Sequence, residues 1–415
     1  MEGWKIEKLE NLIDVKGGKR LPRGEKLVDT PTPYPYLRVT DFENFSVNKT
    51  QLKYLEPQVM EKIKNYIIRK EDVFISIAGT IGFVGKIPDE LDGANLTENA
   101  ARLIIKNKEI LHRDYLVYFL SATHNRDELL SRMSKNAQPK LSLANIKSFD
   151  ILIPPLPEQR KIAHVLSTVQ KAIEQQDNLI RTTTELKKAL MQKLFTEGTR
   201  GESQRKTEIG LVPKSWKVVE LDDICERVSI NAEPNKDGNT PYIGLEHIIP
   251  SRIRIYSWGH ENEIVSSKSK FNKGEILYGK LRPYLDKAAI AHFDGICSTD
   301  ILVFTGKNGV ENEFLIHFFH IEKLVNYAKS TTTGVQHPRT SWNTLKKLKL
   351  GLPEKNERSD IIRSLNSFED KVEILEKKKR TLAALFKTLL HELMTGQRRV
   401  HELEFEDKKI VNQTE

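Results

Sequence analysis

The segment LIPPLPEQRKIAHVL at residues 152–166 determines the predicted fold, because three prolines are followed at once by a long helix-forming run. Pro154, Pro155 and Pro157 restrict the backbone, and proline is well tolerated in the first turn of a helix. A similar segment, LPEKNERSDIIRSL, occurs at residues 352–365. Each segment therefore predicts a fixed angle at which a globular domain passes its chain to a helix.

The sequence is duplicated with a period near 200 residues. EGWKIEKLENLI at residues 2–13 returns as KSWKVVELDDIC at residues 214–225. Further along, QPKLSLANI at residues 138–146 aligns with HPRTSWNTL at residues 337–345. This period is much longer than that of any solenoid repeat, so it indicates a duplicated domain with its helix.

Both copies show the same order of patterns. Short β-like runs punctuated by glycine and proline come first, followed by a short helix, a polar loop and the long helix. Residues 196–216 between the copies are rich in glycine, serine, threonine and charge, which predicts a linker.

The long helices carry matching apolar stripes. Steps of four and three residues from Ile361 give ten positions, of which nine are apolar, the spacing of a coiled-coil seam. The equivalent positions of the first helix include Gln176, Thr183 and Lys187 in the middle, so we expect the centre of the pair to be wetter. An isolated striped helix is poorly stable in water, so each stripe is expected to cover the other. The alternative is that each stripe packs on its own globular domain. The seam residues singled out are Ile162, Leu166, Val169, Ile173, Ile361, Leu365, Phe368, Val372 and Leu375.

These patterns predict an α+β protein with two globular domains of mixed structure. Two long antiparallel helices forming a coiled coil join the domains, and the internal repeat implies an approximate twofold relation. A helix of about 36 residues spans about 54 Å. Two DNA half-sites one helical turn apart are separated by about 34 Å, so such helices could set the distance between two readers. Diverged repeats imply an asymmetric target.

Composition limits the class of protein. The 415 residues are 38% hydrophobic and 30% charged, and no apolar stretch reaches the roughly 18 residues of a membrane span. The first residues lack a signal-peptide pattern, and Cys225 and Cys297 form no metal or disulfide framework, which suits a reducing cytoplasm. The net charge of +9 favours polyanionic partners.

Paired loops before the long helices are the best candidates for DNA contact. Residues 134–142 and 331–342 both mix basic, amide and hydroxyl side chains, which bond to phosphates and base edges. The turn at 278–285 is basic, although the uncharged turn of the first copy favours a structural role. KGGKRLPRGEK at residues 16–26 is a further basic loop, and a solvated surface is the alternative for each residue. The candidates are Lys19, Arg20, Lys135, Asn136, Gln138, Lys140, Lys280, Arg282, Tyr284, Gln336, His337 and Arg339.

No catalytic motif is recognisable in the sequence. GTIGFVGK at residues 79–86 has the wrong spacing for a phosphate-binding loop, and no amino-methyltransferase tetrad is present. The histidines are scattered and match no metal-ligand spacing. We therefore predict a chain with no catalytic and no metal site. The alternatives are a self-contained DNA methyltransferase or nuclease with duplicated readers, and a coiled-coil scaffold that does not bind DNA.

Three segments carry a resemblance to a known family. IPPLPEQRKIAHVLSTVQKAIE at 153–174, IGLVPKSWKVVELDDI at 209–224 and GKLRPYLDKAAIAHFDGICSTDILVF at 279–304 resemble specificity (S) subunits of Type I restriction-modification enzymes. The similarity covers nearly the whole chain. The second copy departs from the proline signature, with GLPEKNER at 351–358.

The resemblance implies a role for each part of the chain. Each target recognition domain would read one half of a split double-stranded DNA site, and the helices would set the spacer. Two methyltransferase (M) subunits carrying S-adenosylmethionine would dock on the helices, and restriction (R) subunits using ATP and Mg would join them, with no cofactor in this chain. Glu158, Gln159 and Arg160 match the signature and would fix the start of the helix or contact an M subunit. The implied parts are target recognition domain 1 (1–150), the first spacer helix (151–198), the linker and target recognition domain 2 (199–348), the second spacer helix (349–396) and a charged tail (397–415).

Overall fold

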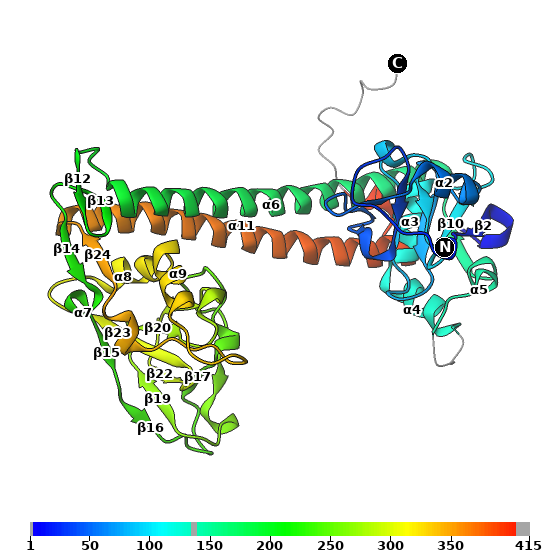
Figure 1. The fold of residues 1–415 in the computed structure, drawn as a ribbon. Helices are drawn as coiled ribbons and strands as arrows, with labels where there is room; N and C mark the ends of the chain where they lie inside the picture. Colours follow the sequence, from blue (N-terminus) through cyan, green and yellow to red (C-terminus); the bar gives the residue numbers. More distant parts are fainter. Residues whose placement is uncertain (1–2, 134–138, 404–415) are drawn as a thin grey trace. The chain divides into compact units, whose positions relative to one another are not determined.

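The chain forms two compact units, each built on one copy of the duplicated sequence. The computed structural model describes residues 3–133 and 139–403. We call residues 1–175 with 379–415 unit 1, and residues 176–378 unit 2. Two long helices, α6 (Leu156–Glu197) and α11 (Lys355–Thr395), each contribute one half to either unit (Figure 1).

Unit 1 is centred on a four-stranded antiparallel sheet in the order β2-β10-β7-β8. Segments between β2 and β10 in the chain also form a second sheet, β6-β3-β9, and the hairpin β4-β5. Strand β1 pairs with β11 directly before α6. The strands are β1 (Lys5–Lys8), β2 (Ile13–Gly17), β3 (Pro35–Leu37), β4 (Phe42–Glu43), β5 (Ser46–Val47), β6 (Lys53–Tyr54), β7 (Val73–Ser76), β8 (Val84–Lys86), β9 (Asn95–Leu96), β10 (Ala100–Ile105) and β11 (Asp150–Ile153). The helices are α1 (Leu9–Leu12), α2 (Pro57–Ile63), α3 (Arg113–Ser121), α4 (Thr123–Ser131) and α5 (Leu143–Lys147).

Unit 2 repeats this plan around the sheet β15-β23-β20-β21, with α8 against it (Figure 1). A second sheet has the order β16-β19-β22-β17-β18, and β14 pairs with β24 directly before α11. The strands are β12 (Gln204–Thr207), β13 (Gly210–Pro213), β14 (Lys217–Glu220), β15 (Cys225–Val228), β16 (Asn231–Ala232), β17 (Pro241–Ile243), β18 (Gly259–His260), β19 (Lys268–Phe271), β20 (Ile276–Gly279), β21 (Ala288–Ile290), β22 (Gly295–Cys297), β23 (Ile301–Gly306) and β24 (Lys349–Leu352). The helices are α7 (Leu221–Ile224), α8 (Asn312–Phe319), α9 (Glu322–Ser330) and α10 (Trp342–Leu345), and the short 3-10 turns include η5 (Pro283–Leu285). The 3-10 turn η6 (Val400–Glu402), which follows α11, belongs to unit 1.

The predicted duplication and the α+β class are confirmed. The sheet β2-β10-β7-β8 corresponds strand for strand to β15-β23-β20-β21, and β1-β11 corresponds to β14-β24. The linker differs from the expectation of a simple polar connection, because residues 204–213 form the hairpin β12-β13 with Val212 buried. The segments at 151–155 and 349–354 also begin as strands, so each long helix starts a few residues after its strand ends.

Both long helices are longer than the 36 residues expected, at 42 and 41 residues. In each unit the two helices pack antiparallel, since the start of one meets the end of the other. In unit 1, Ile162 and Leu166 share a core with Leu389 and Leu393. In unit 2, Ile361 and Leu365 share a core with Met191 and Leu194. These cores also contain residues of the globular domain, so each stripe covers the other helix and packs on its own domain. The seam residues Val169, Ile173, Phe368 and Leu375 are partly buried, and Val372 is buried.

The centre of the first stripe is not wet, which corrects the sequence-based expectation: Gln176, Thr183 and Lys187 are all buried. Lys187 forms an ion pair with Glu369 of α11 in unit 2. Arg252 of the globular domain lies 3.6 Å from the same carboxylate, through Nε and Oε2. A buried charge is tolerated only when it is paired, and here two cations share one carboxylate.

The equivalent place in unit 1 is aromatic instead of ionic. With the repeat offset, Lys187 and Glu369 correspond to Phe386 and Gln170. The ring of Phe386 packs against Phe45 at 5.8 Å and Tyr118 at 6.1 Å between centroids. The Gln170 amide accepts a hydrogen bond from the Tyr118 hydroxyl at 2.9 Å. The two units therefore join their domains to the helices by different chemistry.

Stability of unit 2 is expected to fall in acid because of His317. Burial in α8 lowers the pKa of its imidazole to about 3, and the charge of Lys187 adds to the effect. Below the ordinary histidine pKa near 6.5 the unfolded chain takes up a proton and the folded chain does not. With respect to His317, the folded state is therefore most stable above about pH 6.5, and its stability declines as the pH falls toward 3.

We expect the free energy of unfolding to drop by about 1.4 kcal/mol per pH unit below 6.5 from this residue alone. Urea unfolding at pH 7.5, 6 and 5 measures the slope. The variant His317→Gln keeps a polar side chain without titration, so its slope should be shallower than that of the wild type by this amount. Equal slopes in the two proteins would contradict the prediction.

Candidate nucleic-acid interface

Two segments of unit 2 that the sequence treated separately come together at one end of the sheet. The turn after β20 and the loop before α10 are joined by backbone hydrogen bonds. Arg282 N donates to Pro338 O at 2.7 Å, and Thr340 N donates to Lys280 O at 3.0 Å. This places Lys280 and Arg282 beside Gln336, His337 and Arg339, and we call these five residues the unit 2 basic surface.

The side chains of the unit 2 basic surface face solvent to different extents. Arg282, Gln336 and His337 are exposed, while Lys280 and Arg339 are partly buried. Arg282 adopts the left-handed backbone conformation, with φ of 50°, which a non-glycine residue rarely takes. Tyr284 does not belong to this group, because it lines a groove against α6.

Unit 1 has the corresponding arrangement. Leu141 N donates to Ile77 O at 2.9 Å, as Thr340 N does to Lys280 O, so Lys140 and Arg339 hold equivalent positions. The loop after β2 reaches the same end of the sheet, where Gly18 N donates to Ala100 O at 2.9 Å. We call Lys19, Arg20 and Lys140 the unit 1 basic surface. The candidates Lys135, Asn136 and Gln138 lie outside the described residues.

Both surfaces contain an acidic residue that the sequence analysis did not single out. Arg20 Nε lies 2.7 Å from Glu98 Oε1, and Arg339 Nε lies 2.9 Å from Asp300 Oδ1. The Arg339 guanidinium lowers the pKa of the Asp300 carboxyl. Burial raises the pKa of the Glu98 carboxyl, but the hydrogen bonds from Arg20, Thr97 and the backbone, together with the charge of Arg20, outweigh it, so the net shift is downward. The only signal in the sequence for Glu98 and Asp300 was that each lies one or two positions before a buried strand.

The start of each long helix is fixed by its own domain. In unit 1, Glu158 accepts from Trp4 Nε1 at 3.1 Å and pairs with Arg399 at 2.7 Å. Gln159 is fully buried; its carbonyl accepts from His112 N at 2.8 Å and its amide donates to Ile110 O and Pro154 O, both at 2.8 Å. The side chains of Glu158 and Gln159 are therefore engaged within unit 1, and the neighbouring Arg160 is exposed.

Unit 2 repeats this connection with different side chains. Trp216 Nε1 donates to Glu357 at 2.9 Å, and Thr199 N donates to the same carboxylate at 2.7 Å. Arg358 replaces Gln159 and donates to Pro353 O at 3.0 Å and Gly309 O at 2.7 Å. Although the second copy departs from the proline signature, its Glu357 accepts an indole hydrogen bond as Glu158 does in the first copy.

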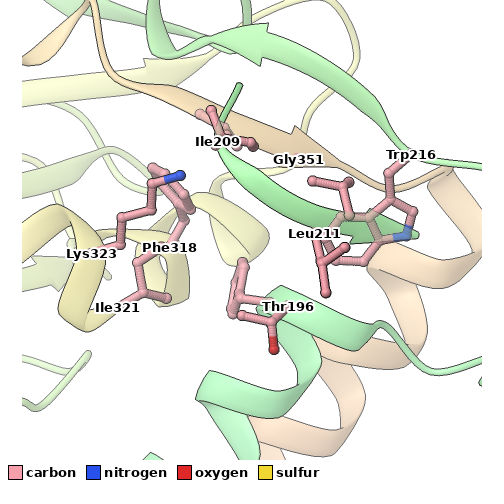
Figure 2. A pocket seen from close by; sticks show the side chains of 11 residues that line it. Thr196, Ile209, Leu211, Trp216, Phe318, Ile321, Lys323 and Gly351 are labelled. Atoms are coloured by element: carbon pink, nitrogen blue, oxygen red, sulfur yellow. The ribbon is translucent and has the colours of Figure 1, made fainter. Parts of the chain in front are cut away.

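Unit 2 contains a cavity and a groove. A cavity of about 90 Å³ between the end of α6, the β12-β13 hairpin and α8 is lined by Thr196, Leu211 and Phe318, with Trp216 at one side (Figure 2). A groove of about 610 Å³ runs between α6 and the domain, lined in part by Lys187, Ser251 and His320. Ser251 and His320 both bond to Asp286, at 2.6 and 2.7 Å, and His320 also bonds to Ala288 O. Both ring nitrogens of His320 are therefore engaged within the domain.

Within residues 3–133 and 139–403, no cluster of three or more histidine, cysteine, aspartate or glutamate side chains could hold a metal ion. The same described residues contain no helix with the length and apolar character needed to cross a bilayer. Cys225 and Cys297 are buried and not disulfide-bonded.

Each unit thus consists of a sheet domain with basic side chains at the same sheet end and a long helix joined to that domain. The model of the Type I restriction modification DNA specificity domain matches residues 1–181 and 213–384. The chain belongs to this family, as the resemblance implied.

Individual relatives agree with this assignment over nearly their whole length. The chain is 25% identical to the putative Type I restriction enzyme MjaX specificity subunit of Methanocaldococcus jannaschii, covering 96% of this chain and 94% of the relative. It is likewise 25% identical to the MjaVIII specificity subunit of the same organism, covering 97% and 95%. The fold resembles the crystal structure of a Type I S subunit from M. genitalium, with a TM-score of 0.59 and 17% identity over 94% of this chain and 96% of that chain.

Proposed function

We propose that this chain reads a two-part asymmetric site on double-stranded DNA, with the unit 1 basic surface contacting one half-site and the unit 2 basic surface the other. The observation that carries the proposal is the equivalence of Lys140 and Arg339, which hold the same place in two diverged copies of one domain. Arginine and lysine contact both phosphates and guanine edges. The divergence of the loops around them supports two different half-sites.

We further propose that the paired helices set the spacer between the half-sites and that two M subunits dock on them. Leu186 of α6 and Leu385 of α11 occupy equivalent positions in the two copies, and both are exposed, by 55% and 44%. Equivalent exposed leucines suit one partner surface used twice. S-adenosylmethionine, ATP and Mg would belong to the M and R subunits, and the assembly would act in the cytoplasm, where the unpaired cysteines remain reduced.

The spacer can be tested by lengthening both helices together. The pairing of Lys187 with Glu369 implies that the residues near Thr183 face those near Glu373 in unit 2. Four residues inserted at each of these places lengthen the pair by about 6 Å, which is one to two base pairs. We expect the spacer to grow by that amount while both half-sites stay unchanged.

Methylome sequencing of cells that express the chain with its M subunits measures half-sites and spacer together. Cells expressing the chain without M subunits should carry no marks, which separates a reader from a self-contained methyltransferase. Altered half-sites with the original spacer would contradict the role of the helices. A four-residue insertion in the loop at 233–237 is a control that should leave the spacer unchanged.

A further inference from the structure

Arg339 of the unit 2 basic surface forms an ion pair with Asp300, and the two equivalent positions of unit 1 hold different residues. Arg339 donates through Nε to Asp300 Oδ1 at 2.9 Å and through Nη2 to Oδ2 at 3.2 Å. Both side chains remain accessible, with exposed fractions of 41% and 25%. A guanidinium held by two parallel hydrogen bonds keeps one orientation, because rotation breaks both.

The backbone around the pair is also fixed. Thr333 and Arg339 exchange two hydrogen bonds of 3.0 Å, which closes the loop between them. Lys280 N donates to Asp300 O at 2.9 Å, and Lys280 O accepts from Thr340 N, the residue after Arg339. The backbone segments that carry Asp300 and Arg339 are therefore both hydrogen-bonded to Lys280. Little freedom remains to be lost when a ligand binds, which favours selective recognition.

The repeat shows what unit 1 has at the same place. Ile77 N donates to Asn99 O at 2.8 Å, as Lys280 N donates to Asp300 O. Asn99 and Lys140 therefore occupy the positions of Asp300 and Arg339. Asn99 has a neutral amide and Lys140 an ammonium group that acts as a point charge, so this pair cannot hold a planar guanidinium in one orientation. The two units thus differ in the chemistry of one equivalent pair.

We propose that Asp300 is a positioning residue that makes Arg339 a reader of one guanine in the half-site of unit 2. This inference rests on the proposed function. With Nε and one side of Nη2 taken by the carboxylate, Nη1 and the remaining N–H of Nη2 are left as adjacent donors. Two adjacent donors match the O6 and N7 acceptors that guanine alone presents in the major groove.

The same carboxylate keeps Arg339 away from phosphates. The pair has no net charge, and a carboxylate next to a phosphate is repelled. Arg339 therefore contributes base discrimination and little of the salt-dependent affinity that comes from counterion release. Removing the carboxylate should reverse this balance and turn Arg339 into a phosphate contact.

The test compares wild type with Asp300→Asn, each assembled with its M subunits, on duplexes in which every half-site position is randomised. We expect the preference for one G·C pair in one half-site to weaken by about 5- to 150-fold. Binding to unrelated duplex should become tighter at low salt, with the dependence on salt concentration steeper by about one counterion. Arg339→Ala should lose the same preference without the gain in unspecific binding.

The other half-site reports whether the assembly is intact, since its preferences should not change in either variant. Glu98→Gln is the matched control, because it releases Arg20 in unit 1 and should leave the half-site of unit 2 unaltered. A uniform loss of affinity with all base preferences retained would overturn the role of Asp300. A wild-type assembly with no half-site preference at all would instead refute the proposed function.

Discussion

Replacing Glu369 by leucine is expected to lower the free energy of unfolding by about 3–5 kcal/mol. Glu369 is 1% exposed and is the shared anion between Lys187 of α6 and Arg252 of the globular domain. Its removal leaves two cations buried with less compensation, and breaking a buried pair on one side is far more damaging than replacing the whole pair by apolar residues.

Urea unfolding measures the loss, and amide hydrogen exchange localises it, since opening should become easier in the unit 2 halves of α6 and α11. Asp370→Leu is the matched control on the next residue, because Asp370 pairs with Arg254 at an exposed position and should contribute less than about 1 kcal/mol. Combining Lys187→Met with Glu369→Leu should recover part of the loss. If the two single variants at 369 and 370 were equally mild, the ion pair would have no structural importance.

Periodicity was sufficient to predict the helices and their pairing. The stripe from Ile361 and its counterpart from Ile162 have one period over about nine turns, and only a long helix covered along its whole length satisfies that pattern. Because the sequence is duplicated, the order of elements in the second copy could be predicted from the order in the first. These features are local or repetitive, so they can be inferred from the spacing of residue types.

The chemistry at the centre of each unit could not be predicted in the same way. Lys187 breaks the apolar pattern, which suggested solvent, but its partner Glu369 lies 182 positions away in sequence. Asp300 and Arg339 are likewise 39 positions apart and meet only because two loops share one sheet end. Side-chain pairs of this kind depend on tertiary geometry, and a single sequence carries no signal of which acid meets which base.

The proline signature illustrates an intermediate case. Its spacing predicted where α6 begins, while the choice between fixing the helix and contacting a partner stayed open. Glu158 and Gln159 are engaged within their own unit, which supports a role for them in fixing the helix start. Arg160 is exposed, which leaves a partner contact for it as a proposal.

The glutamates at the two helix starts should differ in importance, and this difference tests how each domain is joined to its helix. Glu357→Ala is expected to cost about 2–4 kcal/mol, because a carboxylate 1% exposed accepts from Trp216 Nε1 and Thr199 N, and both donors lose a charged acceptor. The preceding Gly198 has φ of 71°, and a β-carbon there would lie 2.3 Å from the Glu357 carboxylate, so the chain leaves little room to adjust.

Glu158→Ala should cost less, about 1–2 kcal/mol, because the Glu158 side chain is 11% exposed and that of Glu357 only 1%, so water can replace more of the lost contacts at Glu158. Urea unfolding of both variants gives the comparison, and Glu357→Gln serves as the control, since an amide oxygen still accepts the indole hydrogen bond and should restore part of the loss. Hydrogen exchange at the Thr199 amide reports the hydrogen bond from Thr199 N to Glu357 directly and should accelerate in Glu357→Ala. A larger loss from Glu158→Ala than from Glu357→Ala would show that exposure of the carboxylate does not govern the strength of these connections.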